Sequence, residues 1–274
     1  MYRARSCCNR VTSWTWTSRR AMIACNPRMP SPDADLTRPR TFAPPLAELL
    51  GVSMHRVVLS MIAGSVDVIG LYALDMFTSH ITGNLVLLAA RIVGGEPARI
   101  GQLLSVPVFV VVLVLTKWLV DRLESSGLAP LRTLLLLQFL LIAGLLAVCV
   151  ATGAFVHPDS AGAILAGILG VSGMAVQTTI VLIFLRSSPT VAMTMSIARF
   201  TLDVSAILSR RDSGEVADAR SRTREAGYVI GGFAVGCAAG AACAAAVGPW
   251  SLALPAGLAA LAFTMAGADL ERRP

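Results

Sequence analysis

The sequence predicts an all-α membrane protein, a polytopic helix bundle with six long spans and two short polar helices of a broken or re-entrant kind. The first observation is composition: 55% of the 274 residues are apolar, only 14% are charged, and the mean hydropathy is +0.70. A soluble domain carries about a quarter charged residues. The second is a series of apolar runs, each near the ~20 residues that an α-helix needs to cross a hydrocarbon core. The third is a basic N-terminus beside the first run.

Residues 1–50 lack helical periodicity and are rich in Arg, Ser, Thr and Pro, which predicts a disordered basic lead before a transmembrane domain at 53–270. Residues 1–56 hold nine Arg against three acids, so they carry +6 of the net charge of +7. Such an excess beside the first span favours a cytoplasmic N-terminus, and we expect no nucleic-acid partner. The lead lacks the apolar core of a cleaved signal peptide, and Met29 and Met54 leave a later start open.

Short polar links separate the long apolar runs, while two stretches, 81–93 and 190–208, are less apolar and carry Thr, Asn, Ser and Arg. These two stretches either cross or fold back. If they fold back, only Arg91 and Arg99 lie outside and 21 of the 23 Lys and Arg lie in the cytoplasm, an asymmetry that the positive-inside rule favours. Both arrangements predict an inner (plasma) membrane protein with both termini in the cytoplasm. The long runs lie at about 57–77, 103–120, 133–156, 161–185, 227–247 and 249–268.

Two of the runs carry small residues at every fourth position, an arrangement that lets helix backbones approach closely in lipid. The pattern fits either packing within one monomer or a homo-oligomer formed through these faces, and the first is the commoner case. The residues are Gly162, Ala166 and Gly170 in one run and Gly232, Gly236, Gly240 and Ala244 in the other.

Asp67 lies near the middle of the first apolar run. A carboxylate there costs about 2.5–3.5 kcal/mol on the insertion scale, so its surroundings must compensate for it. Intramembrane acids usually face a bundle interior or an aqueous cavity and mark an ion path, a proton relay or a structural pair. The alternative is a buried acid that holds helices together by hydrogen bonds alone.

The polar segment 77–84 follows, with sequence FTSHITGN. A helix-breaking Gly83 between two apolar runs predicts a broken or re-entrant element, because irregular backbone at membrane depth needs protein or water to satisfy its polar groups. Thr82 and Asn84 offer side-chain oxygens for a substrate or ion. His80 could titrate near neutral pH, although a lone His is more often a hydrogen-bonding residue at the interface.

The second polar stretch has a comparable character. Thr194 lies in it, and Arg199 and Asp203 are four residues apart, so they can pair on one helix face; Arg199 could instead neutralise Asp67 across the bundle. Gln177 is either a substrate-site residue or, more commonly, an interhelical hydrogen bonder. Asp67 precedes Thr82 by 15 residues and Gln177 precedes Thr194 by 17, which hints at the duplicated halves that transporters often have.

These motifs resemble those of the YoaK-like family of bacterial multi-pass membrane proteins, a domain of unknown function, over about residues 57–268. Residues 64–67 (GSVD) resemble its Gly-x-Val-Asp-Ala element, Phe77 with 82–84 (TGN) its Phe…Thr-Gly-Asn element, and 173–177 (GMAVQ) its later Gly-x-Gln element. Thr194 resembles its second Thr-Gly element, but Met195 replaces the glycine, and Val68 replaces Ala after the Val-Asp. The resemblance implies the architecture and brings no substrate.

The leading functional hypothesis is a secondary transporter or permease for a small solute, and the alternative is a non-transporting scaffold or partner subunit of the membrane. We expect no enzyme, because neither a His-Glu-x-x-His nor a Gly-x-Ser-x-Gly motif occurs. We expect no metal or cofactor either, since neither Cys nor His has ligand spacing. The hypothetical substrate or ion site comprises Asp67, Thr82, Gly83, Asn84, Gln177, Thr194 and Arg199.

Overall fold

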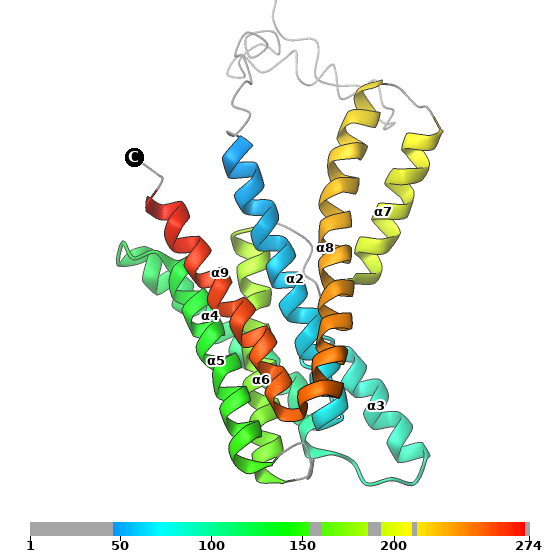
Figure 1. Ribbon diagram of the computed structural model, residues 1–274, viewed down its shortest axis with the longest axis vertical. Coiled ribbons are helices and arrows are strands. Elements are labelled where there is room, and N and C mark those ends of the chain that lie inside the picture. Colours follow the sequence, from blue (N-terminus) through cyan, green and yellow to red (C-terminus); the bar gives the residue numbers. More distant parts are fainter. Residues whose placement is uncertain (1–45, 154–159, 186–192, 210–212, 272–274) are drawn as a thin grey trace, which may run out of the picture. The chain divides into compact units, whose positions relative to one another are not determined.

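The computed structural model describes residues 46–153, 160–185, 193–209 and 213–271, which form helices and the segments that join them. The predicted all-α class is confirmed for these residues. Most of the predicted lead at 1–50 lies outside them, so the lead stays a prediction. In chain order (Figure 1) the elements are α2 (Leu46–Leu74), α3 (Ile81–Val93), α4 (Ile100–Ser125), α5 (Pro130–Thr152), α6 (Ala161–Ile183), α7 (Met193–Leu208), α8 (Ser213–Val247), the 3-10 helix η3 (Gly248–Leu252) and α9 (Ala253–Glu271).

Among the described residues, five stretches are long and apolar enough to cross a membrane, so the chain has the character of a multi-pass membrane protein in contact with lipid. They are Met54–Leu74, Ile100–Ser125, Pro130–Thr152, Ala161–Ile183 and Ala219–Ala266. The predicted number was six. The last stretch, of 48 residues, covers the predicted run 227–247 and most of the run 249–268, because only the short η3 separates α8 from α9.

The first span ends earlier than predicted. The apolar run was expected to continue to residue 77, but α2 ends at Leu74. Asp75 then adopts a φ of 53°, in the left-handed region that a non-glycine residue seldom occupies. The next five residues are not helical, and α3 begins only at Ile81.

The two short helices lie in the predicted polar stretches. The stretch 81–93 coincides with α3, which has 13 residues, and α7 has 16 residues within the predicted 190–208, of which 190–192 lie outside the described part. At 1.5 Å per residue they measure about 20 and 24 Å. Both are therefore shorter than the ~30 Å hydrocarbon core.

The core of the bundle is built around α2 and α6. In their apolar windows 72% and 78% of the residues are buried, against 17% in α4. Helix α2 packs against α8, α9 and α6, and α6 packs against α5 and α4. Most residues of α2 and α6 therefore face other helices, while most of α4 lies on the outside of the bundle.

Both small-residue faces pack inside the chain. A Cβ atom at Gly236 would lie 2.7 Å from the Cα of Met61 in α2, and one at Gly240 would lie 2.9 Å from the Cα of Ser65. In α6, a Cβ at Gly170 would lie 2.9 Å from Thr78 Cγ2. These contacts show packing within one monomer, the commoner of the two alternatives, and the homo-oligomer stays a prediction.

Candidate functional site: a buried carboxylate that holds a non-helical segment

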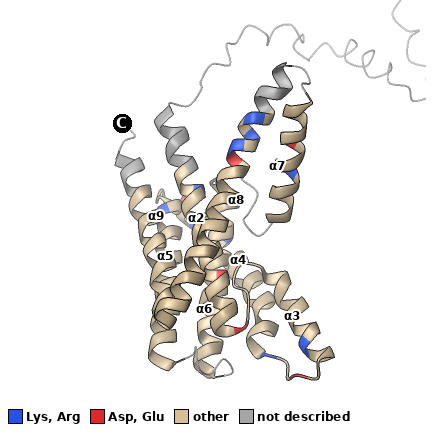
Figure 2. Cartoon of the chain, turned by 45° about the vertical axis from the view of Figure 1, so that its right-hand side comes forward, with Lys and Arg blue, Asp and Glu red and all other residues tan. Residues whose placement is uncertain are grey.

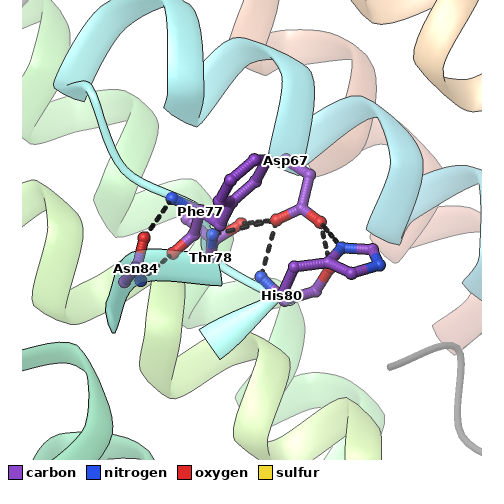
Figure 3. A network of polar contacts seen from close by, with 6 residues as sticks. Asp67, Phe77, Thr78, His80 and Asn84 are labelled. Carbon is purple, nitrogen blue, oxygen red and sulfur yellow. Dashed lines mark hydrogen bonds and ion pairs between the residues drawn. The ribbon is translucent and has the colours of Figure 1, made fainter. Parts of the chain in front are cut away.

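The centre of the site is Asp67, a residue that is 3% exposed and whose carboxylate contacts the segment after its own helix. Its Oδ1 accepts hydrogen bonds from the backbone N–H of Thr78 at 2.9 Å and of Ser79 at 2.6 Å, and from the Thr78 hydroxyl at 3.1 Å. Its Oδ2 accepts from the Ser79 hydroxyl and contacts Nδ1 of His80 (Figure 3). Both oxygens are therefore bonded within the chain.

Asn84 bonds the backbone of Phe77, the residue that precedes Thr78 and Ser79. Its Oδ1 accepts from the backbone N–H of Phe77 at 2.7 Å, and its Nδ2 donates to the Phe77 carbonyl at 2.8 Å. The amide side chain thus pairs with Phe77 as a neighbouring strand would. With Asp67, it satisfies the N–H groups of three successive non-helical residues, which irregular backbone at membrane depth requires.

The segment between α2 and α3 lies inside the bundle. Met76, Thr78 and Ser79 are all buried. Glycines make room for it: a Cβ at Gly70 would lie 3.2 Å from the Met76 carbonyl oxygen, and one at Gly167 of α6 would lie 2.6 Å from Met76 Sδ. The segment is therefore packed closely against both α2 and α6.

His80 connects the buried carboxylate to the outside of the bundle. Its side chain is 32% exposed, whereas that of Asp67 is 4% exposed. The ring contacts Phe77 edge-on at a centroid distance of 6.1 Å and Phe233 of α8 at 5.6 Å. The hydrogen bond that the His80 ring donates to the Asp67 carboxylate raises the pKa of His80 above its usual value of 6.5, although partial burial opposes the shift. The two side chains form an ion pair when His80 is protonated.

A second polar cluster surrounds Asp75, at the point where α2 ends. Its carboxylate pairs with Arg91 of α3 and with Nε of Arg99 at 2.9 Å, and Arg91 also pairs with Glu96 at 2.8 Å. Gln102 of α4 donates to the Asp75 carbonyl at 2.7 Å. These contacts fix α3 and the start of α4 to the end of α2.

Gln177 lies in the core, where it joins three helices. Its Oε1 accepts from Nε2 of Gln138 in α5 at 2.7 Å, and its own Nε2 donates to the Leu59 carbonyl in α2 at 2.8 Å. These contacts match the interhelical hydrogen bonder, the commoner of the two interpretations. They share no residue with the Asp67 network.

The remaining predicted site residues are on the surface. Thr82 is exposed on α3, next to Gly83, whose Cβ would lie 2.8 Å from the Phe77 ring. Thr194 and Arg199 are exposed on α7, which packs chiefly against α8. Arg199 is not among the described residues that contact the Asp67 carboxylate.

Asp203, the suggested partner of Arg199, forms a two-pronged contact with Arg222 of α8 at 2.8 and 3.2 Å. The structure therefore gathers Asp67, Gly83 and Asn84 around one segment. It leaves Gln177, Thr194 and Arg199 elsewhere.

Sequence reasoning missed the roles of several polar residues. Thr78, Ser79 and His80 all lie in the segment that was singled out, but their common acceptor was not foreseen. Gln138 was overlooked, although it is the single strongly polar residue within the apolar run LLLLQFLLIAG of α5. That isolation was the available signal, because an amide inside a lipid-spanning helix needs a partner.

The fold and this network define a class: a polytopic α-helical membrane protein whose first span is followed by an enclosed non-helical segment. The chain belongs to the family of proteins of unknown function DUF1275, whose model matches residues 56–265. That range contains every predicted site residue, while the YoaK-like label stays a prediction. Comparison with curated proteins and with solved structures gives no match.

Proposed function

We propose that the protein is a secondary transporter or permease for a small solute, and that the segment 75–80 with the start of α3 is its moving part. The observation that carries the proposal is the Asp67–His80 pair, a titratable contact that joins non-helical backbone to the most buried part of α2. Ionisable residues inside a bundle typically mark ion or substrate pathways. Breaks between helices are the usual binding places in transporters.

The pair offers a physical route from ion binding to movement. The Asp67 carboxylate holds Thr78 and Ser79 by their backbone N–H groups. A change in the charge or partners of that carboxylate weakens several hydrogen bonds at once, since all of them end on the same two oxygens. His80 is partly exposed and so gives protons or cations a way to reach the carboxylate.

The proposal includes six crossings. A single helix of 48 residues would measure about 72 Å, far more than the ~30 Å core, and in Ala219–Ala266 the α-helix is interrupted by η3, where Gly248 has a φ of 55°. We assign one crossing to α8 and one to α9. With six crossings and with α3 and α7 folding back, the two termini lie on the same side of the membrane, and the proposal puts them in the cytoplasm because of the basic N-terminus. It includes an inner-membrane location and no enzymatic role.

A second function, a scaffold or partner subunit without transport, is favoured by a different observation. Both oxygens of Asp67 and both polar ends of Gln177 are bonded to the chain itself. Side chains arranged in this way stabilise a bundle without any ligand. Transport requires that the hydrogen bonds of Asp67 break and re-form, whereas a scaffold keeps them intact.

The deciding experiment is a solute flux assay in proteoliposomes at several pH values, with the wild type, Asp67→Asn and the control Asp203→Asn. Transport predicts flux for at least one solute class, lost or made independent of pH in Asp67→Asn and retained in Asp203→Asn. Absence of flux for every class from folded wild-type protein would leave the scaffold. Unchanged flux in folded Asp67→Asn would remove the pair from the mechanism.

A further inference from the structure

The N-terminal half of α8 has three differently occupied faces. One face packs against α7, where Arg222 pairs with Asp203 at 2.8 Å. A second packs against α2, where Glu225 pairs with Arg56 at 2.8 Å. Among the described helices none covers the third face, whose residues Arg220, Arg224 and Tyr228 are exposed. This face is therefore accessible to a ligand.

The open face carries two arginines and a tyrosine in line. Arg220, Arg224 and Tyr228 follow one another at intervals of four residues, so they lie on the same side of the helix, and all three are exposed. Arg56 and Arg222 have carboxylate partners. Within the part of the chain that the structure describes, Arg220 and Arg224 have none.

The position of these residues along α8 is that of the lipid headgroups. Residues 229–247 contain no charged residue, and at 1.5 Å per residue their 19 positions cover about 28 Å, close to the thickness of the hydrocarbon core. Tyr228 then lies at the boundary, where tyrosine is favoured, and Arg224 lies about 6 Å beyond it. Figure 2 shows the corresponding change along α8, from blue and red bands to uninterrupted tan.

On the C-terminal side of Tyr228 the same face of α8 consists of small apolar residues. A Cβ at Gly231 would meet nothing within 4 Å, and Val235 is 55% exposed. Ala238 and Ala242 continue the face and are also exposed. An extended acyl chain can lie along these small side chains while its headgroup reaches the arginines.

We propose that this face of α8 binds an anionic phospholipid, with the phosphate held between Arg220 and Arg224 and an acyl chain along Gly231 and Val235. Guanidinium groups match phosphate oxygens in charge and geometry. Basic residues at the membrane surface attract anionic lipids. The site is separate from the Asp67 network and is expected in a transporter and in a scaffold alike.

The test is native mass spectrometry of the full-length protein with equimolar phosphatidylglycerol and phosphatidylcholine. The wild type should retain phosphatidylglycerol preferentially. In the double variant Arg220→Gln/Arg224→Gln, the ratio of bound phosphatidylglycerol to bound phosphatidylcholine should fall about thirtyfold, the effect of removing two basic residues at an anionic surface. Arg220→Lys/Arg224→Lys, which keeps the charges, should retain most of the preference.

Arg122→Gln is the matched control, because Arg122 stacks on Trp118 at 4.9 Å and is an exposed interfacial arginine of α4. It should leave the preference unchanged, and circular dichroism checks that every variant is folded. An unchanged preference in the folded double Gln variant would overturn the proposal. So would an equal loss in the control, or displacement of the lipid by millimolar inorganic phosphate at constant ionic strength.

Discussion

The stretch from Asp67 to Asn84 and the stretch from Gln177 to α7 look alike in sequence but differ in structure. In the first, Asp67 and Asn84 are both buried and bond the same non-helical segment. In the second, Gln177 bonds α5 and α2, while Thr194 is exposed on a helix packed against α8. A similar spacing of polar residues therefore does not give a second site. The site in the first stretch exists because the Asp67 carboxylate accepts hydrogen bonds from backbone N–H groups that no helix uses.

The largest expected difference between the two stretches is in the stability that is lost when the acid of each, Asp67 or Asp203, is replaced. Asp67→Asn removes the charge that pairs with His80 and weakens the acceptors of Thr78 and Ser79, so we expect a loss of about 3–5 kcal/mol, typical of breaking a buried pair. Asp203→Asn breaks a contact with Arg222, which is 60% exposed, and should lose about 0–1 kcal/mol. Reversible unfolding in mixed detergent micelles measures both. Equal losses would mean that the Asp67 network is no stronger than a surface contact.

Asn84 and Thr194 allow the next comparison. Asn84→Ala leaves the partly buried N–H and C=O of Phe77 without these partners, and we expect about 2 kcal/mol of destabilisation. Thr194→Ala changes an exposed side chain and should remain within about 0.5 kcal/mol of the wild type. The same unfolding assay applies to both. A large effect at Thr194 would restore the second stretch as a functional equivalent of the first.

The Gln177 link should behave as a coupled pair. Gln177→Leu leaves Nε2 of Gln138 buried without its acceptor, which costs about 1–3 kcal/mol. Adding Gln138→Leu should recover part of that loss, because two apolar side chains leave no unsatisfied donor. A double-mutant cycle on unfolding free energies measures the coupling. Strictly additive losses would show that the 2.7 Å contact between the two amides contributes nothing.

The smallest expected effect is on the pH dependence of stability. The pKa of His80 is raised in the folded protein, so the ion pair with Asp67 stabilises the fold fully below the unfolded value of about 6.5, and this contribution is lost as pH rises through the raised value. As the pH rises from about 6.5 through the raised pKa of His80, the wild type should therefore lose stability relative to His80→Gln. Thermal unfolding at a series of pH values measures the difference between the two proteins. Parallel profiles would indicate that His80 is neutral in the folded state.

Much of the first site could be predicted because burying a charge in lipid is so unfavourable. Asp67 and the segment 77–84 stand out for that reason alone. The hydrogen bonds could not be predicted, since they depend on where α2 ends and on Asp75 adopting a φ of 53°. Composition and run lengths similarly identified the bundle, and the break predicted between the runs 227–247 and 249–268 lies where α8 ends at Val247 and Gly248 has a φ of 55°.

The missing glycine of the second stretch also has a structural reason. Gly83 lies against the Phe77 ring, where a Cβ would come within 2.8 Å. Met195 occupies the corresponding position after Thr194 and is 53% exposed. Because about half of this residue is exposed, a larger side chain is tolerated there. The sequence difference was visible, but its meaning depended on exposure that only the structure shows.

The hydrogen bonds around Asp67 and Asp75 join residues that are close in the chain, with consequences for the order of biosynthesis. The contacts to Asp67 reach 13 residues ahead, and the bond from Gln102 to Asp75 reaches 27. By contrast, the bond from Gln177 to Leu59 spans 118 residues, and that from Arg56 to Leu185 spans 129. As the ribosome releases the N-terminal part first, the polar partners of Asp67 are present as soon as α3 has been synthesised. A nascent chain therefore contains every polar partner of its intramembrane acid long before α6 has been synthesised.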